Sequence, residues 1–264
     1  MARSIYIASP NAGTGKSTVA LGLVSCLTKV VAKVGVFRPF VESREGDAFL
    51  TLLLNRAGST TPAEQCVGAT WDELHADPEE ALARIVDAYR ALAREHDVVI
   101  IDGSDFTDVA GNPELALNAR VAANIGVPVL LVVSGQHDAE DVLGSVEVSM
   151  AEIADNHART VAVVANKCHP DTRQAVADAL AAVEGVTSTT LPEVPLLAAP
   201  AVREVLDAVE GTLIAGDETL LDREAESVLV CAMDVSHVLE RLTAGQVAIV
   251  PADRSAMLIS LMAA

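Results

Sequence analysis

The chain has 264 residues, with 37 acidic against 18 basic side chains and a formal net charge of −19. A protein this acidic repels the phosphate backbone of nucleic acids and anionic lipid, so general binding to either is excluded. Apolar residues make up 51 %, enough for a large core, while aromatic residues make up only 3 %, too few for stacking on single strands. Any phosphate group must therefore be bound locally, by backbone amides and a few cations.

The cysteines and the apolar runs give further limits. Four cysteines lie far apart, at positions 26, 66, 168 and 231, without any C-x-x-C pair, which argues against a structural zinc site. No segment reaches the roughly 18 consecutive apolar residues of a membrane span. The N-terminus lacks a cleavable signal pattern. We expect a cytoplasmic protein with free thiols and no membrane partner.

Predicted strands and helices alternate along the first 200 residues. A helix is expected from Lys16 to about Val31, and another begins at Pro78 with Asp77 as its N-cap. Pro39 is expected to stop the second strand. The predicted strands are 4–8, 33–38, 97–102, 128–133 and 160–166. The last three are continuous apolar runs typical of central parallel strands, so the sequence predicts an α/β layered fold with a parallel sheet.

The chain changes character near Pro195 to Pro200. An amphipathic helix is expected at 201–209, followed by an acidic stretch. The remaining elements are then predicted as a strand at 227–233, a helix at 236–242, a strand at 246–251 and an apolar helix at 255–264. Two units of one strand and one helix each cannot bury both faces of a sheet. We predict one domain over 1–200 and the start of a smaller, truncated α/β domain over 201–264.

The strongest functional motif is NAGTGKST at residues 11–18, directly after the first strand and at the start of a helix. A phosphate-binding loop needs this placement, because backbone amides at a helix N-terminus then face the phosphates. The full pattern has glycine where Pro10 stands, so the alternative is a loop that shapes the helix start and no longer binds. The candidate nucleotide-binding residues here are Gly13, Thr14, Gly15, Lys16, Ser17 and Thr18.

Metal-binding candidates follow from the same motif. The Ser17 hydroxyl is a candidate Mg²⁺ ligand, and Asp102 ends the apolar strand 97–102, where it can hold Mg²⁺ through water. The alternative for Asp102 is that it caps the next turn. Asp105 and Asp108 follow in a loop on the same edge of the sheet, either near the metal or simply solvated.

Two further residues are expected in the crevice outside the strand ends. Asn166 ends a later strand, and its amide can donate and accept toward an adenine edge or instead stabilise the turn that follows. Arg38 ends the second strand, where it can pair with a phosphate or carboxylate of a ligand or form a surface ion pair.

Residues 1 to about 200 resemble dethiobiotin synthetase, within the P-loop NTPases. The segments that carry the resemblance are 9–18, 37–39, 101–103, 129–133, 163–166 and 191–196. The resemblance implies that Lys16 and Ser17 bind phosphate and Mg²⁺, that Asn166 reads adenine, and that the cofactors are Mg²⁺ and ATP or another nucleotide. Ser9 stands in place of a glycine of that family, and Arg38 in place of a lysine.

The whole chain is similar to the N-terminal region of multidomain bacterial phosphate acetyltransferases, where a dethiobiotin synthetase-like domain precedes a DRTGG-type domain. The segments that carry this likeness are 14–21, 32–39, 66–68, 103–109, 163–168, 191–200, 211–216, 237–242 and 251–255. The resemblance implies a regulatory and assembly region whose partner is the C-terminal acetyltransferase domain of the same polypeptide. That absent domain would transfer acetyl between coenzyme A and phosphate. A homo-oligomer is expected.

Two other functions remain open. An ATP-dependent ligase like dethiobiotin synthetase would use the same loop, although the altered Ser9 and the segment 102–105 disfavour it. A purely structural oligomerisation module, with a loop that no longer binds, is the second, favoured by Pro10 and the apolar end at 257–264.

Overall fold

The computed structural model describes residues 3–104 and 114–263, so Asp105 and Asp108 lie outside the described residues. The chain divides into two compact units, Met1–Glu193 and Val194–Ala264. Among the helices described, none is both long enough and apolar enough to cross a bilayer.

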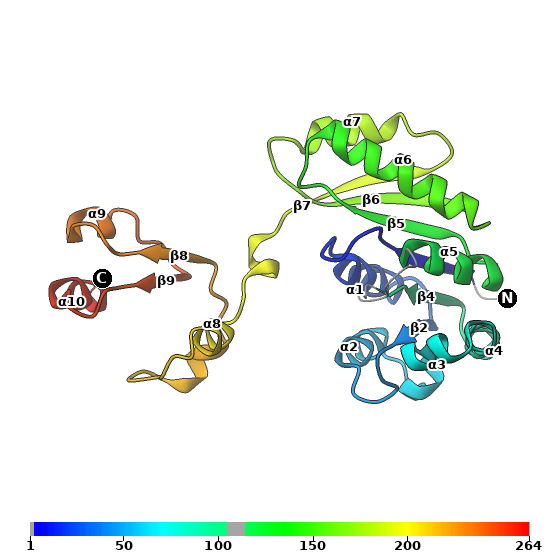
Figure 1. Ribbon diagram of the computed structural model, residues 1–264, viewed down its shortest axis with the longest axis horizontal. Coiled ribbons are helices and arrows are strands. Elements are labelled where there is room, and N and C mark those ends of the chain that lie inside the picture. Colours follow the sequence, from blue (N-terminus) through cyan, green and yellow to red (C-terminus); the bar gives the residue numbers. More distant parts are fainter. Residues whose placement is uncertain (1–2, 105–113, 264) are drawn as a thin grey trace. The chain divides into compact units, whose positions relative to one another are not determined.

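The first unit is built on a seven-stranded parallel sheet in the order β3-β2-β4-β1-β5-β6-β7 (Figure 1). The strands are β1 (Arg3–Ala8), β2 (Val34–Val41), β3 (Val67–Thr70), β4 (Val98–Asp102), β5 (Val129–Ser134), β6 (Thr160–Cys168) and β7 (Thr187–Pro192). The five predicted strands and the parallel sheet are confirmed. The order places β1 in the middle, between β4 and β5, and β6 lies next to β5, so the three strands predicted as central all lie inside the sheet.

Strand β2 does not stop at Pro39, contrary to the prediction. It pairs with β4 over Val34–Phe37 and with β3 from Arg38 to Val41. Pro39 itself is absent from both registers, so its missing N–H removes no bond from either ladder. The strand therefore continues past the proline and carries Arg38 in its middle.

The helices form two groups around the sheet. Helices α1 and α2 contact each other, and α3 to α7 contact one another in chain order. With right-handed crossovers, this order places the two groups on opposite faces of the sheet. Their bounds are α1 (Lys16–Leu27), α2 (Ala48–Ala57), α3 (Trp71–Ala76), α4 (Pro78–Glu95), α5 (Glu114–Ile125), α6 (Ala139–Asp155) and α7 (Arg173–Ala181), with a short 3₁₀ turn at Ala63–Cys66.

Local sequence signals explain where two of these helices begin and end. Asp77 caps α4 as predicted, because its Oδ1 accepts from the amides of Glu79 and Glu80 at 3.2 and 3.0 Å. Helix α1 ends at Leu27 rather than near Val31. The residues that follow form a hydrogen-bonded turn in which Val30 is 78 % exposed and Val31 packs against the core.

The core of the first unit lies between the sheet and the helices. Side chains of the central strands, such as Ile7, Ile101 and Leu131, are fully buried. All four cysteines are free, as expected, and burial raises the pKa of the Cys66 thiol to about 11.

The second unit is small. Its elements are α8 (Val202–Ala208), β8 (Ser227–Val230), α9 (Val235–Leu239), β9 (Gln246–Ile249) and α10 (Ser255–Ala263), with 3₁₀ turns at Pro195–Ala198 and Glu218–Asp222. Strands β8 and β9 form a two-stranded parallel sheet over a core of Cys231, Val238 and Met257. The predicted alternation of strands and helices is confirmed. That the unit is a truncated domain stays a prediction.

Candidate nucleotide-binding site

The loop between β1 and α1 has the backbone that the motif predicts. Gly15 is the N-cap of α1 with a φ of 79°, and Gly13 has a φ of 76°, both in the left-handed region. The first helical bond runs from the Val19 amide to the Gly15 carbonyl at 3.1 Å. The amides before Val19 therefore precede the helical ladder, at the positive end of the helix dipole, where an anion is favoured.

The loop is held from the end of β6. The Asn166 side-chain amide donates to the Thr14 carbonyl at 2.9 Å, and Lys167 Nζ donates to the Gly13 carbonyl at 2.8 Å. These bonds fix the loop carbonyls toward β6. Asn166 thus lies beside the loop, as its position at a strand end predicts. That it reads adenine stays a prediction.

Gly15 and Asn166 leave no room for a side chain between them. A Cβ on Gly15 would lie 2.3 Å from Asn166 Nδ2. Gly15→Ala is therefore expected to destabilise the fold by about 2–3 kcal/mol, from left-handed backbone strain and a displaced hydrogen bond. In an Asn166→Ala background only the strain remains, so Gly15→Ala should cost about 1 kcal/mol less there than in the wild type when both are measured by urea unfolding. An equal cost in both backgrounds would contradict this close contact.

Three predicted residues, Lys16, Arg38 and Asp102, meet at the end of β4 beside the start of α1. Lys16 Nζ lies 2.6 Å from Asp102 Oδ1 and also donates to the Gly103 carbonyl. Arg38 Nε lies 3.3 Å from Asp102 Oδ2, and the Arg38 guanidinium pairs with Asp47. The register explains the contact, because Phe37 pairs with Ile101 and the next residues of both strands are neighbours. Lys16 and Asp102 are both fully buried.

The residues at this position fit a magnesium ion with a nucleotide. Asp102 Oδ2 is buried and accepts no hydrogen bond from the described residues, which leaves a carboxylate oxygen with spare acceptor capacity. Ser17 is half-buried and directly follows Lys16 at the start of α1. Carboxylate and hydroxyl oxygens are the ligands Mg²⁺ prefers. Thr18 is exposed on the first turn of the helix.

A buried polar network behind Asp102 was not predicted. Tyr6 donates its hydroxyl to Asn118 Oδ1 at 2.6 Å, and the same oxygen accepts from the Ser104 amide at 3.1 Å. Ser104 Oγ donates to Glu114 at 2.9 Å. Burial, followed by the negative charges of Asp102 and Glu114, raises the pKa of Tyr6 well above its usual value, so its hydroxyl stays a donor. No sequence signal marks Asn118, which lies mid-helix.

Asp47 is a further site residue that was not predicted. Its Oδ1 caps α2 by accepting from the Leu50 amide at 2.8 Å, while its other oxygen pairs with Arg38. An aspartate before the apolar residues 48–50 is an N-cap signal, so the helix start was open to prediction. The ion pair with Arg38 was not, because it depends on the tertiary fold.

The sheet, the glycine loop and the buried lysine–aspartate pair define an α/β protein of the P-loop NTPase class. Residues 3–201 match the AAA domain family, and residues 204–264 match the DRTGG domain. Since the first match covers most of the chain, the chain belongs to this AAA domain family.

Among curated proteins, the chain is similar to phosphate acetyltransferases. It is 26 % identical to that of Nitratidesulfovibrio vulgaris, over 100 % of this chain and 39 % of the relative. It is 25 % identical to that of Synechocystis sp., over 100 % of this chain and 40 % of the relative. The chain thus spans about 40 % of the length of these relatives and corresponds to their N-terminal region.

Solved structures show the same fold at low identity. A plasmid partition protein of Borrelia burgdorferi B31, bound to AMPPNP, matches with a TM-score of 0.53 and 14 % identity, over 84 % of this chain and 94 % of that one. Chloroplast FtsY of Physcomitrella patens matches with a TM-score of 0.50 and 19 % identity, over 74 % of this chain and 59 % of that one.

Proposed function

We propose that this chain is the N-terminal regulatory and assembly region of a cytoplasmic phosphate acetyltransferase. It binds a nucleotide or another anionic effector in its P-loop and acts on a C-terminal acetyltransferase domain of the same polypeptide. The complete protein converts acetyl-CoA and phosphate to acetyl phosphate and CoA. The observation that most supports nucleotide binding is the buried Lys16–Asp102 pair beside a preformed glycine loop.

Other findings support the proposal. The curated relatives are longer than this chain, which leaves room for a catalytic domain. A solved structure with the same fold holds AMPPNP. In a chain with a net charge of −19, Lys16 and Arg38 place two cations beside the loop, and these favour an anion there.

Each residue of the site has its own role in binding nucleotide and Mg²⁺. The loop amides and the α1 N-terminus bind phosphate oxygens, and Lys16 shifts part of its bonding from Asp102 to the phosphate. Ser17 and Asp102 would hold Mg²⁺, which offsets phosphate charge when bound. Arg38, tied to Asp47 and Asp102, holds the Asp102 carboxylate in place beside the loop. These contacts serve binding, and this chain alone is not assigned the acetyl transfer.

Calorimetric titration with Mg-ATP tests the nucleotide site. We expect saturable binding that requires Mg²⁺ and weakens at least about tenfold in Ser17→Ala, since a lost ligand contact of about 1.4 kcal/mol is tenfold in affinity. Ser17 is half-buried and its hydroxyl is small, so the variant should stay folded. Lys29→Ala, at an exposed position beyond α1, is the control and should bind as the wild type does. No heat at millimolar Mg-ATP with folded protein would overturn nucleotide binding.

The regulatory role is tested in the complete polypeptide. Mg-ATP should change the rate of acetyl transfer in the wild type and should have no effect on the rate in Ser17→Ala. A rate that responds equally in both proteins would contradict regulation through this loop.

Subunit mass, measured by light scattering on the chain, tests the proposed homo-oligomer, and a monomer would overturn it.

A further inference from the structure

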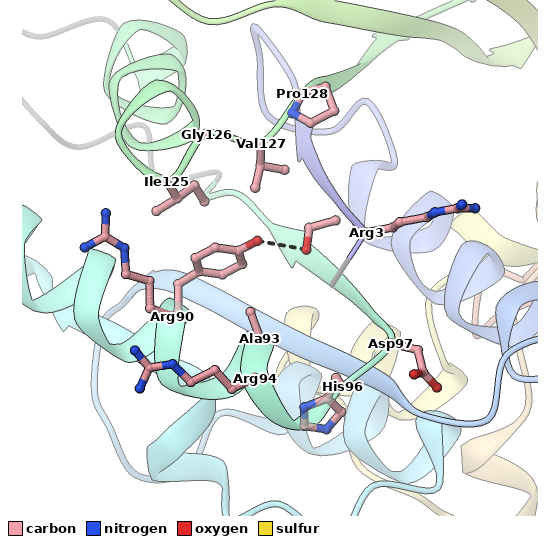
Figure 2. A pocket seen from close by; sticks show the side chains of 12 residues that line it. Arg3, Arg90, Ala93, Arg94, His96, Asp97, Ile125, Gly126, Val127 and Pro128 are labelled. Carbon is pink, nitrogen blue, oxygen red and sulfur yellow. Dashed lines mark hydrogen bonds between the residues drawn. The ribbon is translucent and has the colours of Figure 1, made fainter. Parts of the chain in front are cut away.

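A cavity of about 920 Å³ lies at the end of the sheet where the strands begin, opposite the end that carries the P-loop. It opens where β1, β4 and β5 begin, because Arg3 and Ser4 start β1, His96 and Asp97 precede β4, and Pro128 precedes β5. The ends of helices α4 and α5 complete its wall (Figure 2). The volume is within the range of small-molecule sites.

The cavity collects positive charge in an acidic protein. Its lining includes Arg3, Arg90 and Arg94, all exposed, and within the described parts of the chain none of the three has a carboxylate within 4.0 Å. By contrast, Arg84 of the same helix α4 pairs with Glu73 and Glu80. The arginines of the cavity therefore keep their donors available for an anion from outside.

The remaining charged side chains of the lining are engaged locally. Asp97 Oδ2 accepts from the Lys33 amide at 3.2 Å, and its backbone carbonyl accepts from the Arg3 amide at 3.0 Å. His96 Nδ1 lies 2.9 Å from the Leu92 carbonyl and therefore donates to it. Three guanidinium groups against the one carboxylate of Asp97 leave the cavity lining net positive.

The shape separates charge from an apolar middle. Figure 2 shows Arg90 and Arg94 extending from α4 at one side and Arg3 at the other. Between them lie apolar side chains. Tyr89 and Ser4 also line the cavity, and the Tyr89 hydroxyl donates to Ser4 Oγ at 2.8 Å. The apolar residues of the lining are Ala93, Ile125, Val127 and Pro128. A ligand with an apolar body and anionic groups matches this arrangement.

Helix stabilisation does not account for the arrangement. Arg94 lies in the last turn of α4, where a cation offsets the helix dipole. Arg90 lies one turn earlier and Arg3 lies on a strand, and the dipole effect fades within the last turn. The partial negative charges at the ends of α4 and α5 amount to roughly half a charge each, less than the three guanidinium charges.

We propose that this cavity binds a small organic anion that carries two or more phosphate or carboxylate groups on an apolar body. Arg90 and Arg94 bind one anionic group, and Arg3 binds the other. Guanidinium forks donate to the oxygens of phosphate and carboxylate with the same bidentate geometry, so the shared chemistry is a multivalent oxyanion. The site is separate from the P-loop and does not depend on nucleotide binding there.

The test is amide chemical-shift mapping of the full chain by NMR, with ADP, pyrophosphate and succinate as probes in a buffer without divalent metal ions. We expect saturable shifts at residues 90–97 and 125–128 with at least one probe. In the double variant Arg90→Gln/Arg94→Gln the affinity at these residues should fall at least about tenfold. The matched control, Arg84→Gln/Arg120→Gln, removes the same charge from α4 and α5 and should bind as the wild type does.

The outcomes separate this proposal from nucleotide binding. Shifts confined to residues 13–18 would overturn the cavity site and leave the P-loop proposal intact. Shifts at 90–97 that survive the double variant, or that the control double variant removes equally, would show general charge attraction and would also overturn it. Shifts with ADP or pyrophosphate but not with succinate would identify phosphate as the bound group. Shifts with succinate alone would identify carboxylate. Both variants change exposed residues, and circular dichroism confirms their folding.

Discussion

Asp102→Asn is expected to lower the free energy of unfolding of the first unit by about 3–5 kcal/mol, the usual cost of removing one partner from a buried ion pair. Lys16 is only 1 % exposed and would lose the Asp102 carboxylate, whose Oδ1 lies 2.6 Å from its ammonium. Arg38 would lose its contact with Oδ2 at the same time. The same substitution removes the proposed magnesium ligand, so Mg-ATP affinity should fall with stability.

Lys16→Met should cost less than Asp102→Asn, by about 1–2 kcal/mol. The reason is that Asp102 keeps Arg38 Nε 3.3 Å from its Oδ2, so the buried carboxylate is still compensated by one cation. Urea unfolding followed by the fluorescence of Trp71, the one tryptophan of the sequence, reports this unit directly.

The matched control is Arg120→Met, which breaks an exposed pair with Glu79 and should cost no more than about 1 kcal/mol. If all three variants cost the same, the buried cluster has no special energetic role. If Lys16→Met costs more than Asp102→Asn, Arg38 does not compensate Asp102 in solution.

The sequence predicts the parts of this site that lie within single segments. The loop 11–18 and the strand end at Asp102 each contain their own signal, because a phosphate loop needs glycines, a lysine and a helix start in fixed order. The central strands are equally visible as apolar runs. The continuation of β2 past Pro39 is not, because it depends on β3, a strand of only four residues, Val67–Thr70.

Contacts between distant segments of the chain could not be predicted from the sequence. Arg38 is predicted at the site, but its pairing with both Asp47 and Asp102 follows from the register of β2 against β4 and from the start of α2. Asn118 joins β1 to the segment after β4 through one side chain. Such a residue has no local pattern, since an asparagine on a helix is usually solvated.

Gly103→Ala is expected to destabilise the first unit by about 3 kcal/mol or more, at the upper end of the cost of overpacking. A Cβ at this position would lie 2.6 Å from Asn118 Oδ1, 2.7 Å from the Ile7 carbonyl and 2.9 Å from the Tyr6 ring. The Ile7 carbonyl belongs to the central strand β1 and already accepts from the Gly103 amide at 2.9 Å, so it cannot move aside. The added methyl therefore breaks the network or displaces β4.

Gly22→Ala is the matched control, because Gly22 lies within α1 and its Cβ would meet nothing within 4 Å. The same chemical change should there stabilise the unit by about 0.5–1 kcal/mol, since alanine is the better helix former. Opposite signs in urea unfolding are thus expected for one substitution at two positions. A neutral Gly103→Ala would mean that β4 shifts freely against β1. Asp102 would then be free to move away from the loop, so the buried pair with Lys16 would not be a fixed feature of the site.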